Sequence, residues 1–304
     1  VSLTQEFSQY PFGWKALGVV FKAKGRMSEA VVANQTAIAL SPQDFEAHYN
    51  LGNIYKELGR LEKAEASYNQ AIALKPDYAE AHYNLGNIHK ELGILEEAKA
   101  SYNKVIALNP NYAEAHNNLG ATLKGLRKLD EAEASIRQAI TLKPDYAEAY
   151  GNLGAILKGL GRWEEAETSY NKAIELKPEY AEAHSNLGNM HKELGRINEA
   201  KESYNKAIAL KPDYAEAHRM LASIKKFDSI DAQYSKMLEL YFDKNISDEK
   251  RCHINFGLAK ACDDLGDFEK AFTHYKEGNA LRKKLLNYNI KQDLELFRQI
   301  KSAY

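Results

Sequence analysis

Small and apolar residues recur at helical spacing along most of the chain, in pairs of runs separated by glycine. In the stretch 79–112, Leu85 and Ile88 belong to a first run, and a second run begins at Leu95 after Gly93. Residues three or four apart lie on one face of a helix, so each run predicts an amphipathic helix. Because glycine interrupts the runs and a proline follows them, the stretch predicts two helices joined by a tight turn.

The same pattern returns with a fixed period of 34 residues. Near-copies begin at residues 45, 79, 113, 147 and 181. A period of this length is typical of a solenoid, in which each unit buries its apolar face against its neighbours. The sequence therefore predicts an all-α fold built from stacked helix pairs.

Small residues recur where two helices must approach each other closely. The eighth residue of each copy is glycine, although glycine inside a helix costs roughly 1 kcal/mol relative to alanine. The twentieth residue is always alanine, and we expect it to face the glycine across the helical hairpin. The two sets are Gly52, Gly86, Gly120, Gly154 and Gly188, and Ala64, Ala98, Ala132, Ala166 and Ala200.

These residues, with leucine at the seventh place and proline near the thirty-second, resemble the tetratricopeptide repeat. The family's usual tryptophan at the fourth place is here mostly histidine: His48, His82, His116 and His184. The resemblance covers most of the chain. It implies a right-handed α-solenoid (superhelix) of stacked antiparallel helix pairs, with the first helix of each pair on the concave side.

The repeat register divides the chain into segments. We expect a remnant of a preceding helix at 1–10 and six repeats at 11–44, 45–78, 79–112, 113–146, 147–180 and 181–214. A degenerate repeat with an irregular helix should follow at 215–251, then a repeat-like unit at 252–285 and an amphipathic helix at 286–304. Because the pattern is lost at 227–250, we expect this segment to be the weakest part of the array.

The charge balance and the short apolar runs of the chain limit the classes of partner that we expect. The chain has 41 Lys and Arg against 42 Asp and Glu, and no apolar run reaches the ~18 residues of a membrane span. We therefore expect neither nucleic acid nor a membrane as partner. Cys252 and Cys262, if on one helix, would lie about 15 Å apart, too far for a disulfide. A reducing, cytoplasmic location is expected.

Residues for catalysis are not found. The sequence has no phosphate-binding Gly-x-x-x-x-Gly-Lys-Ser/Thr loop, no Gly-x-Ser-x-Gly elbow and no His-Glu-x-x-His pair. Histidines of successive copies should lie about 10 Å apart, too far to share a zinc ion. We predict no enzyme activity in this chain, no cofactor and no metal site.

Three rows of polar residues should lie on one side of the first helices. The sixth residue is Asn50, Asn84, Asn118, Asn152 or Asn186, and the twelfth is Lys56, Lys90, Lys124, Lys158 or Lys192. The second residue is Glu46, Glu80, Glu114, Glu148, Glu182 or Glu216. Asparagine offers donors and acceptors, so this row predicts a peptide-binding site for the backbone of an extended segment, and the lysines favour an acidic one. Copying of repeats could equally propagate such rows without function.

Two copies differ from the others on this face. The residue after the lysine is Gly125 or Gly159, and the ninth residue is Ala121 or Ala155. We expect a ligand side chain to bind here. The asparagine row also resembles that in the superhelix of O-linked N-acetylglucosamine transferases, where such residues contact substrate peptides.

These observations predict a protein–protein interaction scaffold that binds an extended peptide in its concave groove. An alternative follows from residues 12–18 and 255–283, which look like bacterial proteins whose repeats precede a sulfotransferase domain. The chain would then be the substrate-recruiting, non-catalytic region of a larger transferase with its catalytic domain beyond residue 304. A third hypothesis is self-association through the ends of the array.

Overall fold

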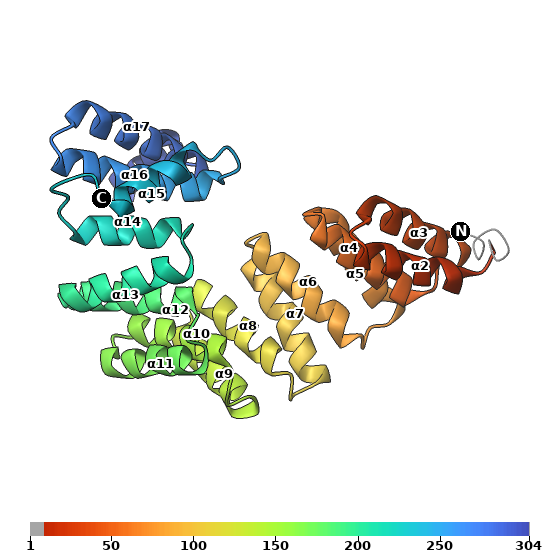
Figure 1. The fold of residues 1–304 in the computed structure, drawn as a ribbon. Coiled ribbons are helices and arrows are strands. Elements are labelled where there is room, and N and C mark those ends of the chain that lie inside the picture. Colours follow the sequence, from red (N-terminus) through yellow and green to blue (C-terminus); the bar gives the residue numbers. More distant parts are fainter. Residues whose placement is uncertain (1–8, 304) are drawn as a thin grey trace. The chain divides into compact units, whose positions relative to one another are not determined.

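A computed structural model describes residues 9–303, so the helix remnant expected at 1–10 lies almost entirely outside the described part. The described residues form 17 helices and no strand (Figure 1). The predicted all-α solenoid of helix pairs is confirmed. The chain divides into two compact units, Val1–Arg162 and Trp163–Tyr304.

The first unit consists of helices that pack against their neighbours in sequence order (Figure 1). From Phe45 onward the first helix of each pair has 13 residues and the second has 14. The helices are α2 (Pro11–Ala23), α3 (Met27–Leu40), α4 (Phe45–Glu57), α5 (Leu61–Leu74), α6 (Ala79–Glu91), α7 (Leu95–Leu108), α8 (Ala113–Gly125), α9 (Leu129–Leu142) and α10 (Ala147–Gly159).

Within a pair, the turn between the helices contains a residue with left-handed backbone. Gly59 and Gly93 have φ angles of 66° and 76°, which glycine adopts without steric cost. Arg127 occupies the same place after α8 with a φ of 61°. This conformation costs a residue with a side chain roughly 1–2 kcal/mol, so the turn after α8 carries strain that the others lack.

The glycine at the eighth place makes room for an aromatic ring. A Cβ on Gly86 would lie 2.8 Å from Cε1 of Tyr102, and one on Gly52 would lie 2.7 Å from Cε1 of Tyr68. The side chain that fills this space is thus the twenty-fourth residue of the repeat and not the alanine at the twentieth place, although the backbone oxygen of Ala132 would also lie 3.0 Å from a Cβ on Gly120. Ala98 is fully buried nearby in sequence, but the tyrosine ring fills the space above the glycine.

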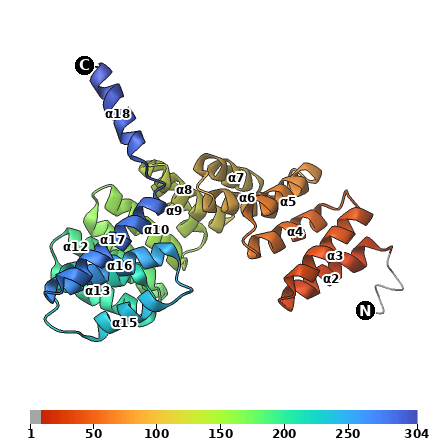
Figure 2. The ribbon, with the colours of Figure 1, turned by 90° about the horizontal axis from the view of Figure 1, so that it is seen from above.

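The second unit continues the repeat and then departs from it. Its helices are α11 (Trp163–Leu176), α12 (Ala181–Glu193), α13 (Ile197–Leu210), α14 (Ala215–Ile224), α15 (Ala232–Phe242), α16 (Asp248–Asp264), α17 (Phe268–Leu285) and α18 (Ile290–Ala303). Helix α16 begins one turn before residue 252 because the side chain of Ser247 accepts a hydrogen bond from the Lys250 amide. Figure 2 shows α18 projecting from the end of α17.

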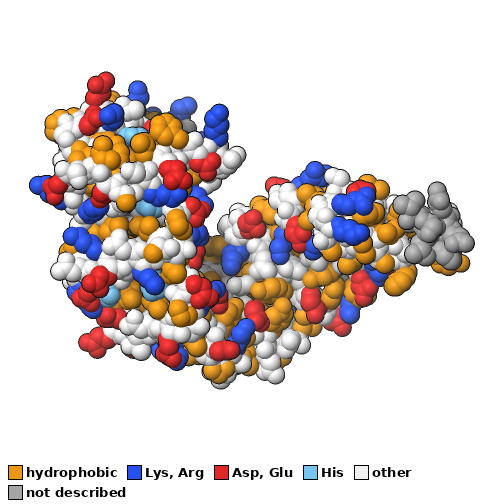
Figure 3. All heavy atoms as spheres, viewed as in Figure 1, with side chains coloured by type: hydrophobic (Ala, Val, Ile, Leu, Met, Phe, Trp, Pro, Cys, Tyr) orange, Lys and Arg blue, Asp and Glu red, His pale blue; other side chains and the backbone are white. Residues whose placement is uncertain are grey.

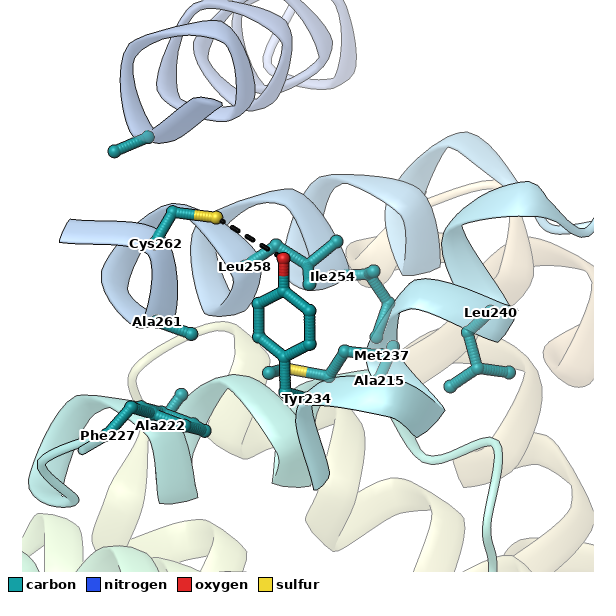
Figure 4. Close-up of a cluster of buried hydrophobic side chains, with 11 residues drawn as sticks. Ala215, Ala222, Phe227, Tyr234, Met237, Leu240, Ile254, Leu258, Ala261 and Cys262 are labelled. Carbon is teal, nitrogen blue, oxygen red and sulfur yellow. Dashed lines mark hydrogen bonds between the residues drawn. The ribbon is translucent and has the colours of Figure 1, made fainter. Parts of the chain in front are cut away.

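A hydrophobic cluster joins α14, α15 and α16 in this irregular region (Figure 4). Phe227 and Met237 are almost completely buried in it. The ring of Tyr234 points toward α16, where its hydroxyl lies 3.7 Å from the sulfur of Cys262. Cys252 and Cys262 are both buried free thiols on α16. None of the described helices combines the length and apolar character needed to cross a bilayer.

Candidate functional site

The polar rows lie on the first helix of each pair. We call the asparagine–lysine face the surface of α4, α6, α8 and α10 that carries the sixth and twelfth residues, namely Asn50, Asn84, Asn118 and Asn152 with Lys56, Lys90, Lys124 and Lys158. The asparagines are half-buried, and each lysine lies in the last turn of its helix. Asn186 and Lys192 hold the same places on α12 in the second unit.

The asparagine row is bonded from one repeat to the next. Asn118 donates from Nδ2 to the hydroxyl of Tyr83 at 3.0 Å and to Oδ1 of Asn87 at 3.1 Å, both on the preceding first helix. Oδ1 of Asn87 also accepts a hydrogen bond of 2.8 Å from the Tyr102 hydroxyl. Burial raises the pKa of Tyr102 above its usual value, so this hydroxyl keeps the proton that it donates.

Asn84 has the same contacts one repeat earlier. Its Nδ2 donates to the hydroxyl of Tyr49 at 2.9 Å and to Oδ1 of Asn53 at 3.3 Å. Its Oδ1 accepts a hydrogen bond of 3.3 Å from Nζ of Lys56. Both hydrogens of the amide therefore bond to the preceding repeat, while its oxygen faces a lysine.

Asn152 follows a variant of this arrangement. The preceding repeat has Asn117 in place of the fifth-place tyrosine, and Asn152 donates to its Oδ1 at 2.9 Å. Asn50 follows a repeat with Lys15 and Val19 at the two acceptor places, and neither can supply the same acceptor. The sequence predicted donors and acceptors along this row, whereas in the structure the amide hydrogens of Asn84 and Asn118 bond to the preceding repeat, and each amide oxygen accepts one contact and keeps a second lone pair.

The positively charged row has its partners in the following repeat. Nζ of Lys22 lies 2.7 Å from Oε1 of Glu57, the thirteenth residue of the next copy. In the second unit, Lys192 donates instead to the hydroxyl of Ser223 at 2.8 Å, again one repeat further on. The partner of each of these two lysines is thus in the next repeat and not beside the lysine in its own helix.

Lys90 and Lys124 lack such a partner because the next repeats have Gly125 and Gly159 at the thirteenth place. Within the described part of the chain, neither ammonium group has a hydrogen bond or an ion pair. Desolvation lowers the pKa of both lysines, and the positive charge of Lys158 lowers the pKa of Lys124 further.

Three glutamates of the acidic row form ion pairs with lysines of the same compact unit. Glutamates in the first turn and lysines in the last turn also complement the helix macrodipole, which gives both rows a structural role. The ion pairs are Lys15–Glu46, Lys143–Glu114 and Lys211–Glu182, at 2.7, 3.4 and 2.9 Å. Over the visible face in Figure 3, side chains of both signs are interspersed, in keeping with a net charge of −1.

Comparison with protein families identifies the repeat. The model described as the C-terminal domain of cilia and flagella-associated protein 70 matches residues 43–226, and the model described as TPR repeat matches residues 18–59. The chain belongs to the tetratricopeptide repeat family. None of the curated proteins matches it significantly.

Solved tetratricopeptide repeat structures share the fold. A thermophilic repeat protein of Thermus thermophilus is 25% identical, with a TM-score of 0.53 over 59% of this chain and 98% of its own. The Cut9–Hcn1 hetero-tetramer gives 20% identity and a TM-score of 0.61, over 73% of this chain and 44% of its own. PilF of Pseudomonas aeruginosa is 18% identical, with a TM-score of 0.59 over 70% of this chain and 97% of its own.

The histidine that replaces the family tryptophan bonds to the end of the preceding repeat. At each fourth place occupied by histidine, Nε2 lies within hydrogen-bond distance of the carbonyl oxygen of the proline six residues earlier. The pairs are His48–Pro42, His82–Pro76, His116–Pro110, His184–Pro178 and His218–Pro212. These rings therefore bond the start of each first helix to the loop that precedes it.

One cluster that the sequence did not predict lies in the second unit. His191, Glu167 and Glu199 have potential ligand atoms within 4.8 Å of one another, as no other group of the kind does among the described residues. Arg196 bonds to both carboxylates, and its contacts to Glu167 measure 2.8 Å. Because the guanidinium group already supplies the positive charge, we interpret the cluster as an ion-pair network.

A spacing in the sequence could have revealed this network. Glu167 and Arg196 are 29 residues apart, as are Glu133 and Arg162, which bond in the same way in the first unit. This spacing of 29 residues is five less than the repeat length, so each such pair links two neighbouring repeats. Pairs at 31 and 35 residues join the asparagine row in the same manner.

We expect the stability contribution of Glu167 to be lost in acid. Its hydrogen bonds to Arg196, above all, lower the pKa of Glu167 from 4.5 to about 2. A lowered carboxyl pKa stabilises the fold above the unfolded value, and this stabilisation disappears as pH falls from 4.5 toward 2. Urea unfolding should therefore show a gap between the native protein and Glu167→Gln at pH 6 that narrows by pH 3. A gap that stays constant would contradict this.

Proposed function

We propose that the asparagine–lysine face binds an extended protein segment, which makes the chain an interaction scaffold without catalysis of its own. Tetratricopeptide repeat arrays are protein-binding scaffolds in general. The observation that carries the proposal here is the orientation of the Asn118 amide. Its two hydrogens are bonded to Tyr83 and Asn87, and its oxygen accepts a long contact of 3.5 Å from Nδ2 of Asn117, so the second lone pair of this oxygen is held as an acceptor for a peptide N–H.

The spacing of the repeats suits an extended segment. Neighbouring helices pack at about 8–10 Å, and an extended chain rises about 3.3 Å per residue. Each repeat would then face about three residues of the ligand. Amide oxygens would accept backbone N–H groups, and the lysines would favour acidic side chains.

A cytoplasmic location and a role within a larger transferase are two further parts of the proposal. Free buried thiols at Cys252 and Cys262 suit the cytoplasm, where thiols stay reduced. The resemblance to repeats that precede a sulfotransferase domain supports an alternative, in which the same face recruits substrate for a transferase. A strand followed by a phosphate-binding loop, encoded after residue 304, would favour that alternative.

Self-association through the array ends is a separate proposal. Phe12 on α2 and Phe272 on α17 are 76% and 70% exposed, which leaves apolar side chains available at the first and the last helix pair. Light scattering of the purified chain at increasing concentration tests it. A constant monomer mass would exclude this form of assembly.

The double variant Asn118→Ala with Asn152→Ala should weaken peptide binding about five- to a hundredfold. Each lost hydrogen bond is worth about 0.5–1.5 kcal/mol. The probe is a fluorescein-labelled dodecapeptide of alternating glutamine and serine, and binding is measured by fluorescence anisotropy. A neutral probe is chosen because its binding depends on backbone contacts.

Tyr83→Phe is the matched control for Asn118. It removes one of the two acceptors of the Asn118 amide, while the remaining hydrogen bond to Oδ1 of Asn87 still orients the Asn118 oxygen. If Asn118 acts on the ligand, Tyr83→Phe should lose thermal stability but little affinity. Equal losses of affinity in both variants would show that the asparagines only support the neighbouring helices.

A further inference from the structure

The thirteenth place of the next repeat decides whether a carboxylate is available to a lysine of this row. Glu57 lies 2.7 Å from Lys22, and the corresponding residue is glycine after Lys90 and after Lys124. Lys90 and Lys124 are therefore the lysines of this row that have glycine in place of a carboxylate in the next repeat. The sequence had instead indicated the lysines directly before Gly125 and Gly159, one repeat further on.

Backbone geometry does not require these glycines. Gly125 and Gly159 are the last residues of α8 and α10, while the left-handed residues that end the turns are Arg127 and Gly161, two positions later. Neither glycine thus serves as the left-handed cap of its helix.

Packing does not require them either. A Cβ on Gly125 would lie 2.9 Å from Cδ1 of Leu95, and this atom is the far end of a flexible side chain. Glu91 occupies the same place one repeat earlier, where the residue equivalent to Leu95 is Leu61. The repeat therefore accepts a glutamate opposite a leucine, and the missing carboxylates need another explanation.

We propose that Lys90 and Lys124 form an anionic side-chain subsite, which receives two acidic residues of the bound segment; this rests on the proposed function. The lysines are one repeat apart, about 8–10 Å. A polyproline II segment has about three residues per turn and rises about 3.1 Å per residue, so its residues i and i+3 lie about 9 Å apart on one side. The subsite thus takes Asp or Glu at every third position.

Neighbouring features support this assignment. The ninth residues of the two repeats are Ala121 and Ala155, where Asn53 and Asn87 stand in the two repeats before. The shorter side chains leave more room for a ligand side chain. Both lysines are exposed to solvent, so an incoming carboxylate can reach them.

The experiment restores the missing carboxylates. Fluorescein-labelled (Glu-Ser-Ser)4 and (Gln-Ser-Ser)4 are titrated by anisotropy with the unmodified chain and with the double variant G125E/G159E. Exposed ion pairs contribute modestly, so we expect the affinity for (Glu-Ser-Ser)4 to fall about two- to thirtyfold. The affinity for (Gln-Ser-Ser)4 should stay within about twofold.

Three further measurements control for added charge, for misfolding of the variant and for the spacing of the glutamates in the peptide. Gly13→Glu adds a charge on α2, where a Cβ would meet no atom within 4 Å, and it should leave both affinities unchanged. K90Q/K124Q should reproduce the effect of G125E/G159E if the latter folds poorly. A peptide with its glutamates in one block should bind the unmodified chain more weakly than (Glu-Ser-Ser)4.

The outcomes separate this inference from the proposed function. If both peptides bind the unmodified chain equally tightly, the face binds extended segments but the subsite does not exist. If neither peptide binds, the proposed function itself fails and the subsite with it. Equal effects of Gly13→Glu and G125E/G159E would overturn the subsite in favour of general charge repulsion.

Discussion

Replacing Tyr102 by alanine will lower the stability of the first unit by about 3–5 kcal/mol, the range for truncating a buried aromatic side chain. The side chain is 0% exposed, and its ring occupies the space that Gly86 leaves. Truncation therefore creates a cavity between α6 and α7 and also removes the hydrogen bond to Asn87. Urea denaturation followed by circular dichroism measures the loss.

Two further variants separate the ring from the hydroxyl. Tyr102→Phe keeps the ring and should cost only about 0.5–1.5 kcal/mol, the value of one hydrogen bond. Gly86→Ala should destabilise the native protein, because its Cβ would lie 2.8 Å from the ring, but should partly offset Tyr102→Ala by filling the cavity. Strict additivity of Gly86→Ala and Tyr102→Ala would contradict this account of the contact.

Replacing Phe227 by alanine will unfold the end of the second unit and leave the first unit folded. Phe227 is 1% exposed within the cluster of α14, α15 and α16, and its amide donates to Asp264 at 3.1 Å. Loss of the ring should cost about 3–5 kcal/mol. Repeat arrays couple mainly between neighbours, so the effect should remain local.

Hydrogen exchange measures how far this effect extends. Amides of 215–285 should exchange faster in Phe227→Ala, whereas those of 45–162 should keep their protection. Phe242→Ala is the control, because this side chain is 70% exposed and its removal should change stability by less than about 0.5 kcal/mol. Faster exchange throughout the chain would show that the two units unfold together.

The sequence predicted the helices well because their signal is periodic. Spacing identifies the face of a helix that is buried, but it does not say which side chain reaches furthest across the hairpin. Gly86 was therefore matched with Ala98, whereas the longer Tyr102 fills the space. The same limit explains the lysine row, since Lys22 bonds to a residue of the next repeat and not to one beside it in its own helix.

Loss of the repeat pattern at 227–250 indicated a weak segment. The structure shows that Phe227, Tyr234, Met237 and Leu240 from this segment are buried in one cluster. Because the apolar residues of this segment do not recur at a fixed period, the sequence did not indicate their packing partners, which lie mostly on α14 and α16. The relative stability of this segment stays a prediction that the exchange experiment measures.

The bonds between asparagines and the preceding repeat also determine how the array could be shortened in protein engineering. Excision of 79–112 would place Asn118 against Tyr49 and Asn53, which offer the same acceptors that it has now. Excision of 45–78 would instead place Asn84 against Lys15 and Val19, and its amide hydrogens would lose both acceptors. Repeats of equal length are therefore not equally interchangeable, and only some junctions can be joined without loss.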